Sequence, residues 1–117
     1  MITCQDYEMW AGDTKAIVVA VVDSNGDPIP EADLELYTIR WVLSTAVGAA
    51  PVISKDNGMI GGITVTGDGE FTITLTPANT IALSGTYYHE ASVEDVGGQV
   101  STVLIGKCQI NKSGITE

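Results

Sequence analysis

The feature that most constrains this fold is a series of short apolar runs, each closed by a turn signal. The clearest run is 70–76 (EFTITLT), in which Phe71 and two further apolar residues alternate with threonines. Such alternation predicts a strand with one buried and one solvated face. Comparable runs cover 5–10, 15–22, 34–44, 52–55, 59–65, 86–95 and 99–110. Because the connections leave no room for crossover helices, we expect an all-β antiparallel sandwich of about seven to eight strands.

The turn residues predict how these strands are joined. The sequence 23–28 (DSNGDP) closes the second run, and 56–58 and 67–69 predict two hairpins in succession. Thr76 followed by Pro77 is typical of a helix start, which predicts one short helix over 77–83 before the second-last strand. Gly97 and Gly98 join the last two strands, and we expect 111–117 to be loose.

Composition and charge limit the classes of partner. The 117 residues, of which 44% are hydrophobic and 17% charged, predict a single domain over 1–117. The net charge of −10 gives a surface that repels phosphate, so nucleic acid and anionic membranes are not expected partners. Neither a signal peptide nor a membrane-spanning segment is predicted, which favours synthesis in the cytoplasm.

The two cysteines, Cys4 and Cys108, lie near opposite ends of the chain. Their spacing does not fit a zinc site of the paired-cysteine type. A disulfide between the first and last strands is geometrically possible, but two unreactive thiols are the favoured interpretation, because cytoplasmic thiols are normally kept reduced.

The lone histidine, His89, is the main candidate for chemistry. An imidazole can act as a general base, but the chain has no nucleophile motif such as G-x-S-x-G. Strand alternation instead turns His89 inward with Trp41, Tyr87 and Phe71 as structural core residues, which predicts a neutral ring with a hydrogen-bonded nitrogen. We therefore expect no enzyme activity, catalytic residue, cofactor, metal or small-molecule substrate.

A second candidate for chemistry is the acidic turn at 23–27 (DSNGD), which begins like a calcium loop. Pro28 stands where the loop needs its glycine, and Leu34 stands where the bidentate glutamate would be. A turn closed by the Asp23 side chain is the better interpretation.

Four residues form a candidate interface. Arg40 and Glu90 are predicted on the outward faces of neighbouring strands, where they could pair across the sheet. Tyr88 and Tyr37 could belong to the same patch, because aromatic and arginine side chains are enriched at interface centres. The alternative is that all four are half-exposed sheet residues.

The segment Gly85-Thr86-Tyr87 resembles the tyrosine corner of immunoglobulin-like sandwiches, in which a tyrosine early in the second-last strand bonds back to the preceding corner. Antibody domains have a cysteine two residues later, whereas this chain has His89. The resemblance therefore implies an immunoglobulin-like fold without the inter-sheet disulfide, with Trp41 in the place of the core tryptophan.

A more specific likeness runs along most of the chain. The segments 11–14, 25–29, 39–41, 75–80, 83–90 and 102–106, in that order, resemble the immunoglobulin-like domains of bacteriophage tails and baseplates, such as the N-terminal domain of siphophage upper baseplate proteins. The resemblance implies a virion structural protein that assembles with itself or with other tail or head components. It departs from the baseplate example because we expect the whole chain to be this one domain.

Two functions remain open at this point. The first is an assembly module of a phage or prophage virion, made in the host cytoplasm, acting through sheet faces and edges as a homo-oligomer or with other virion proteins. The second is a module that displays loops to a carbohydrate or cell surface, for which an exposed aromatic cluster near Trp10 is expected.

Overall fold

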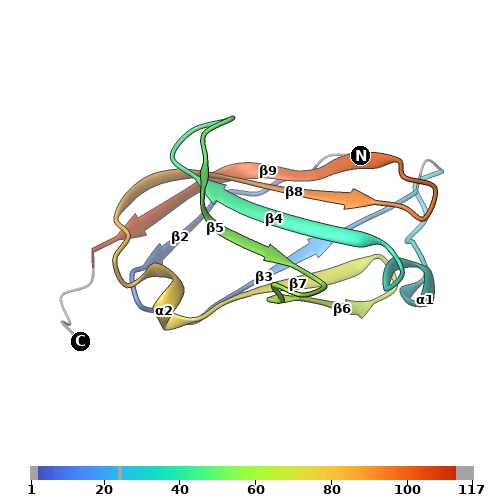
Figure 1. Cartoon of the computed structure of the whole chain (residues 1–117), viewed down its shortest axis with the longest axis horizontal. Coiled ribbons are helices and arrows are strands. Elements are labelled where there is room, and N and C mark those ends of the chain that lie inside the picture. Colours follow the sequence, from blue (N-terminus) through green and yellow to red (C-terminus); the bar gives the residue numbers. More distant parts are fainter. Residues whose placement is uncertain (1–2, 24, 113–117) are drawn as a thin grey trace.

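Residues 3–23 and 25–112 are described by a computed structural model, with side chains from residue 5 onward, and they form two packed β-sheets (Figure 1). The strands are β1 (Thr3–Cys4), β2 (Tyr7–Trp10), β3 (Lys15–Ala20), β4 (Thr38–Ser44), β5 (Pro51–Asp56), β6 (Ile63–Gly67), β7 (Glu70–Leu75), β8 (Gly85–Glu94) and β9 (Val100–Asn111). Two short helices, α1 (Glu31–Leu34) and α2 (Pro77–Thr80), accompany them. The expected all-β sandwich is confirmed.

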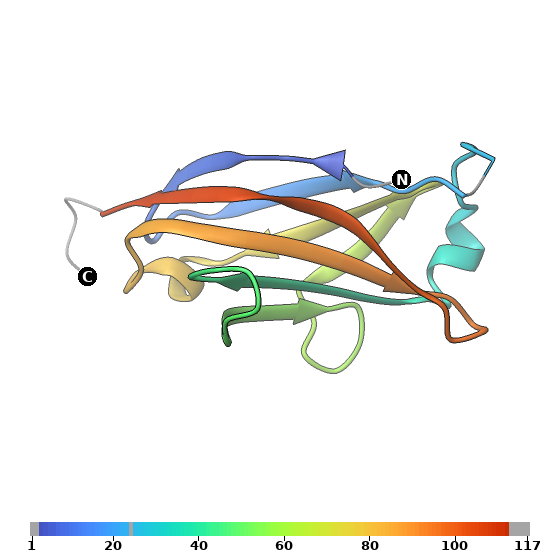
Figure 2. The same cartoon turned by 90° about the horizontal axis from the view of Figure 1, so that it is seen from above.

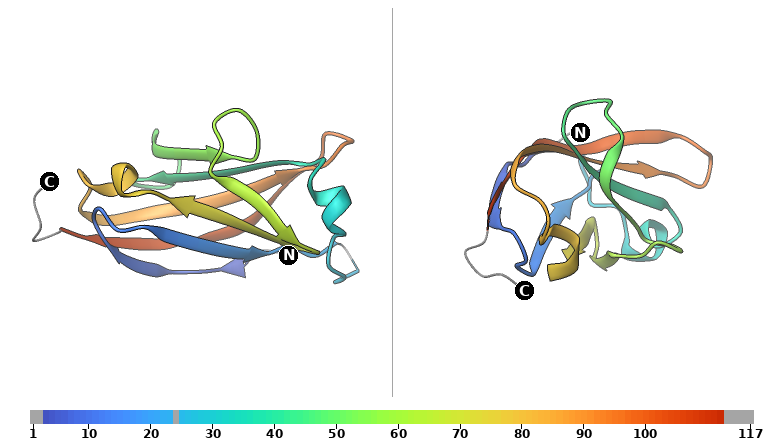
Figure 3. Two further views of the ribbon diagram at one scale, coloured as in Figure 1. Left: turned by 90° about the horizontal axis from the view of Figure 1, so that it is seen from below. Right: turned by 60° about the vertical axis from the view of Figure 1, so that its left-hand side comes forward.

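The sheets differ in size. The six-stranded sheet has the order β1-β9-β8-β4-β5, with β2 also paired to β9, and is seen from above in Figure 2. The three-stranded sheet has the order β3-β7-β6 and is seen from below in the left view of Figure 3. The molecule is elongated, with extents of 45 × 23 × 21 Å, because the long strands β8 and β9 run along its main axis.

The N-terminal strands depart from a purely antiparallel arrangement. Both β1 and β2 run parallel to β9, with Cys4 opposite Ile105 and Tyr7 opposite Cys108. The first strand expected within 5–10 is β2, which covers residues 7–10. After Trp10 the chain turns at 11–14 and enters the other sheet as β3, so one segment borders both layers.

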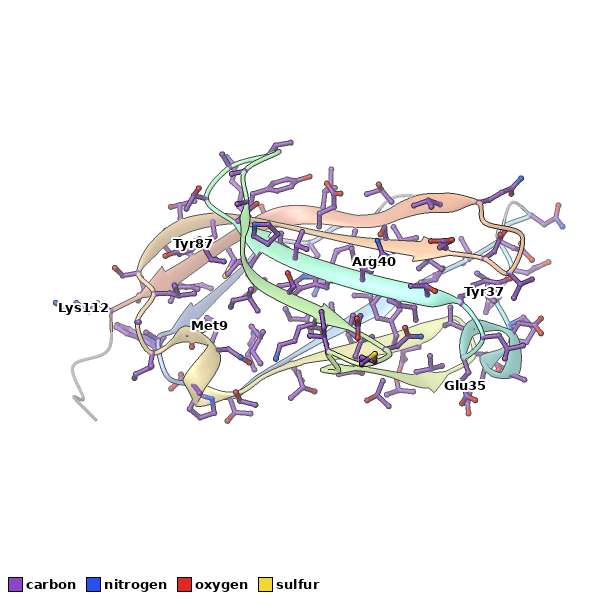
Figure 4. All side chains as sticks on the ribbon, viewed as in Figure 1. Met9, Glu35, Tyr37, Arg40, Tyr87 and Lys112 are labelled. Atoms are coloured by element: carbon purple, nitrogen blue, oxygen red, sulfur yellow. The ribbon has the colours of Figure 1, made fainter. Side chains whose placement is uncertain are left out.

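The core lies between the sheets, where the predicted alternation is confirmed. Trp41 and Phe71 are the largest fully buried side chains, one from each sheet. Inward residues of the larger sheet include Ile39, Leu43, Ala91, Val93 and Leu104, and those of the smaller sheet include Ile17, Val19, Ile73 and Leu75. Side chains fill the space between the layers in Figure 4.

The prediction of a strand from residue 34 was wrong, because helix α1 ends there. Pro30 precedes the helix, and Glu31 and Asp33 lie in its first turn, where carboxylates favour the positive end of the helix. Leu34 is fully buried against the core from this helix. The alternating pattern of 34–44 extends over the end of this helix, whose start is marked in the sequence by Pro30 and the two acidic residues that follow it.

The first predicted hairpin, around 56–58, was also wrong. Strands β5 and β6 belong to different sheets, so the chain crosses between layers at this point. Asn57 holds the crossing, because its Oδ1 accepts from the Ile39 N–H at 3.1 Å and its Nδ2 donates to the Tyr37 carbonyl at 2.8 Å. The second hairpin, β6–β7, is antiparallel as predicted.

Helix α2 begins at Pro77 as predicted but ends at Thr80, before the predicted end at residue 83. Thr80 is fully buried, and its hydroxyl accepts from the Gly12 N–H at 2.9 Å. Asn111 belongs to β9, so that part of the predicted loose tail was wrong; residues 113–117 lie outside the described residues. Neither of the helices in the described ranges is long and apolar enough to cross a bilayer.

Candidate functional site

His89 lies at the centre of a buried polar cluster. Its side chain is fully buried on β8, and Trp41 on the neighbouring β4 is equally buried. The indole Nε1 of Trp41 donates to Nδ1 of His89 at 3.1 Å. The Tyr7 ring meets the imidazole edge to face at a centroid distance of 5.0 Å. The lone imidazole is thus enclosed by two aromatic rings.

The other imidazole nitrogen reaches across a whole strand. Nε2 of His89 lies 2.5 Å from the carbonyl oxygen of Gln5, in the short segment between β1 and β2. Strand β9 runs between these two groups, and its residue opposite His89 is Gly106. A Cβ at Gly106 would lie 2.8 Å from Nε2 and would collide with the Gln5 carbonyl. Only glycine leaves the space for this contact.

These contacts determine the protonation of His89. An indole N–H can only donate, so Nδ1 is the acceptor and Nε2 carries the proton that it donates to Gln5. Burial lowers the pKa of His89 below its ordinary value of 6.5, although the Gln5 carbonyl and the charge of Asp6 partly oppose the shift. The ring is therefore neutral at pH 7, and both of its nitrogens are occupied.

Cys108 and Tyr7 continue the cluster on the inward face of the six-stranded sheet, where Cys108 is fully buried and Tyr7 packs against the core. They lie opposite each other in the register, and burial raises the pKa of the Cys108 thiol to about 11. The pKa of the Tyr7 phenol is also raised, first by burial and then by its contact with Cys108. The Tyr7 hydroxyl is buried and makes no hydrogen bond of standard geometry to any described residue. Its polar neighbour is the thiol of Cys108, which is only a weak hydrogen-bonding group.

The Cys108 thiol is free. The backbone register places Cys4 three positions away from Tyr7, the residue opposite Cys108. An offset of this size separates the two Cα atoms by about 10 Å, whereas a disulfide needs about 4.4–6.8 Å. A bridge between the two cysteines would require a shift of the N-terminal strands along β9.

Tyr87 makes the contact of a tyrosine corner. Its hydroxyl donates to the Ser84 carbonyl at 3.1 Å, three residues back along the chain, and its ring is buried. Gly85, with a φ of 112°, forms the bend between the two residues. Figure 4 shows Tyr87 toward the end of the molecule that carries α2.

The outward residues do not form the single patch that the sequence suggested. Arg40 lies opposite Asp56 on one side and Ser92 on the other, whereas Glu90 lies opposite Val42. No ion pair joins Arg40 to Glu90 in the described part of the chain, because the two are diagonal rather than facing. The cross-strand pair that the outward positions of Arg40 and Glu90 suggested is therefore not formed in the described residues.

Each of these outward charges has another neighbour. The Tyr88 hydroxyl donates to Glu90 Oε1 at 3.1 Å. The N–H groups of Gly61 and Gly58 donate to the Asp56 carboxylate and lower its pKa, with a smaller contribution from Arg40. The outer face of β4 and β8 therefore holds two separate small polar groups.

Tyr37 lies far from Tyr88. It precedes β4 beside α1, as Figure 4 shows. Tyr88 is opposite Ser44, at the other end of that strand. Tyr37 instead lines a half-open pocket of about 370 Å³ between the sheets, with Asp23, Asp95 and Gln99 among its polar groups. Its apolar wall includes the buried residues Val21, Val93 and Val103. This pocket could not be predicted from the sequence, because its residues come from segments far apart in the chain.

The acidic turn has the geometry of a side-chain-closed turn. Oδ1 of Asp23 accepts from the N–H groups of Asn25 and Asp27 at 2.9 and 3.0 Å. Gly26 adopts a positive φ of 85° at the tip. The same carboxylate oxygen that a calcium loop would direct to an ion thus bonds its own backbone; Ser24 lies outside the described residues.

Comparison with known proteins adds no relative. No protein-family profile matches the chain, and no curated protein matches it at a significant level.

Proposed function

We propose that this chain is a structural protein of a bacteriophage or prophage virion, associated with the tail, baseplate or head. It acts as an assembly module that joins copies of itself or other virion proteins through its sheet edges, faces and loops. The order of the segments that resemble phage immunoglobulin-like domains suggests this class. The fold supports it only at the level of an all-β sandwich.

The observation that carries the proposal is the exposure of large apolar side chains on several connecting loops of the sandwich. Met59 and Ile60 between β5 and β6 are 104% and 66% exposed, and Val47 between β4 and β5 is 73% exposed. At the α1 end, Leu36 and Val96 are 72% and 78% exposed. Single exposed apolar side chains are common on monomeric proteins, so the adjacent pair Met59 and Ile60 is the part of this set that best supports a surface covered by a partner.

The buried cluster argues against a reactive role for the imidazole. Both nitrogens of His89 are hydrogen-bonded inside the core, and the ring has no exposed surface. A general base needs hydrogen-bond reach to a substrate proton. The cluster instead joins β4, β8 and the N-terminal segment into one rigid unit, as an assembly module requires.

The proposal is tested by mass spectrometry of purified virus particles from the cells that carry the gene, followed by labelling with an antibody. We expect this chain in the particles at a fixed copy number relative to the major structural proteins. Its absence from intact particles, with the chain present in the lysate, would contradict the assignment.

The second candidate function, carbohydrate binding, rests on the pocket beside Tyr37. An aromatic ring next to carboxylate and amide groups over an apolar wall suits a polyhydroxylated ligand. The aromatic cluster expected near Trp10 is absent from the described residues, because Trp10 is 56% exposed and every other described aromatic side chain is less exposed. A glycan array with the native chain and with Tyr37→Ala tests this function, with Trp10→Ala as the control. Native binding that only Tyr37→Ala abolishes would support it; an array without hits would dispose of it.

A further inference from the structure

The outer edge of β3 has no paired strand among residues 3–23 and 25–112. In the three-stranded sheet, β3 pairs with β7 on one side, and none of these residues forms a strand on its other side. The Val21 N–H donates to the Gly69 carbonyl at 2.7 Å, so the backbone groups of odd-numbered residues point toward the β7 side. Because these groups alternate along a strand, Ala16, Val18 and Ala20 direct their N–H and C=O groups to the open edge.

The same three residues form a flat apolar row. Ala16, Val18 and Ala20 are all exposed on the outer face, and Val18 is 51% exposed. Their neighbours on β7 are Thr74, Thr72 and Glu70. The only charged residue of β3 is Lys15, whose ammonium lies 5.5 Å from the centroid of the Tyr7 ring. The exposed row of β3 therefore carries no charged side chain of its own.

The other edges carry protective features that β3 lacks. Strand β5 begins with Pro51 and ends with Lys55 and Asp56. Strand β6 is irregular between Val65 and Gly67, and α1 lies near it. Strand β2 has four residues and carries an exposed Glu8. Proline, charges, bulges and short length are the usual means of preventing edge pairing, so an open edge without them indicates a surface that is normally covered.

We propose that the β3 edge pairs antiparallel with the β3 edge of a second copy of this chain, about a two-fold axis at Val18. This inference rests on the proposed function, and it identifies a second copy of the chain as the first partner in assembly. The row Ala-x-Val-x-Ala is symmetric about its centre, so Val18 faces Val18 of the second copy and each Ala16 faces an Ala20. Such pairing satisfies the open backbone groups with about six hydrogen bonds and joins two three-stranded sheets.

The charge distribution is compatible with a second copy at the β3 edge. The chain has a net charge of −10, so two copies repel each other over most of their surface. Strand β3 contributes no carboxylate, and Glu70 is the one acidic neighbour on β7. Pairing along β3 therefore brings no carboxylate of the paired strands together.

The first experiment is sedimentation velocity over a range of concentrations with the native chain, Val18→Lys and Val52→Lys. We expect a concentration-dependent native dimer, which Val18→Lys weakens by roughly 100-fold because two ammonium groups then face each other across the axis. Val52 is the matched control, since it is a 44% exposed valine on the edge strand of the other sheet, and its lysine variant keeps the dimer. Circular dichroism verifies that both variants are folded.

The second experiment tests the register by oxidative cross-linking. In the proposed dimer the two Cα atoms at position 18 are about 5.5 Å apart, within disulfide range, whereas those at position 16 are roughly 14 Å apart. Val18→Cys is therefore expected to form a covalent dimer and Ala16→Cys is not. The unsubstituted chain under the same oxidant is the control for Cys4 and Cys108.

A native monomer at every concentration would overturn the proposal, as would a dimer that Val18→Lys leaves intact. A covalent dimer from Ala16→Cys but not from Val18→Cys would equally overturn the stated register. These failures are separate from that of the proposed function. If the chain is found in virus particles but Val18→Lys does not affect its dimer, the proposed virion role stands and the β3 contact is wrong. If the β3-paired dimer forms but the chain is absent from virus particles, the β3 contact stands and the proposed function is wrong.

Discussion

The indole N–H of Trp41 donates to Nδ1 of the fully buried His89 at 3.1 Å, and Nε2 of the same imidazole donates to the carbonyl of Gln5. These two hydrogen bonds join strands β4 and β8 to the segment between β1 and β2, at the edge of the same sheet. They explain how a histidine can occupy the interior of a sandwich at little cost, because every polar atom that its ring brings into the core has a partner.

Replacing His89 by phenylalanine keeps an aromatic ring but removes both nitrogens. The Trp41 N–H and the Gln5 carbonyl then lose their partners, and each unsatisfied group costs about 1–3 kcal/mol. We expect the free energy of unfolding, measured by urea titration, to fall by roughly 2–4 kcal/mol. Ser92→Ala, on the outward face of the same strand, serves as the control, and a loss equal to that of the control would contradict the account.

The depressed pKa of His89 predicts a loss of stability on mild acidification. Above pH 6.5 the ring is neutral in both the folded and the unfolded chain, so the stabilisation is complete. As the pH falls below that value, the unfolded chain takes up a proton that the folded chain refuses, until the folded-state pKa is reached. The free energy of unfolding should fall by at most about 1.4 kcal/mol per pH unit in this window.

The comparison for this pH dependence is the His89→Phe variant, measured between about pH 7.5 and pH 5.5, above the range in which ordinary carboxylates titrate. The variant should show a flat profile there. Equal slopes in the native chain and in the variant would show that another group is responsible.

Gly106 is predicted to be intolerant of any side chain. The Cβ of Gly106→Ala would collide with the Gln5 carbonyl and approach Nε2 of His89 to 2.8 Å, so the N-terminal segment or the imidazole must move. We expect a loss of roughly 3 kcal/mol in the free energy of unfolding. Gly67→Ala is the matched control, because a Cβ there meets no atom within 4 Å. Similar melting temperatures for the two variants would refute the close packing described for β9.

The proposed dimer should become tighter as salt is added. Each copy carries a net charge of −10, and their mutual repulsion is screened at high ionic strength, whereas backbone hydrogen bonds and apolar contacts along β3 are little affected. Sedimentation at low and high sodium chloride measures the effect. A dimer that dissociates with salt would indicate instead that ion pairs hold the copies together.

Much of the core could be predicted from the sequence, because strand alternation has a period of two and identifies the inward side chains. This reasoning placed Trp41, Phe71, Tyr87 and His89 in the interior, where the structure has them. It also predicted the bend before Tyr87, since Gly85 and the tyrosine lie close together in the chain. Local patterns are sufficient where the interacting groups are close in sequence.

Long-range relationships could not be derived in the same way. The Gln5 carbonyl meets His89 across 84 residues, and a backbone oxygen leaves no mark on the side-chain pattern. Nothing in the sequence around Gly106 indicates that its missing side chain is what permits that contact. The failed hairpin at Asn57 has the same origin, because the side-chain bonds that redirect the chain depend on tertiary placement.

The central claim, that the lone imidazole is a buried structural group and offers no reactive centre, is tested most directly by nitrogen-15 NMR of the His89 ring during a pH titration. The account predicts a neutral ring protonated at Nε2 that keeps its chemical shifts as the pH is lowered through 6.5. A ring protonated at Nδ1, or one that titrates at or above 6.5 like a solvent-exposed histidine, would contradict it.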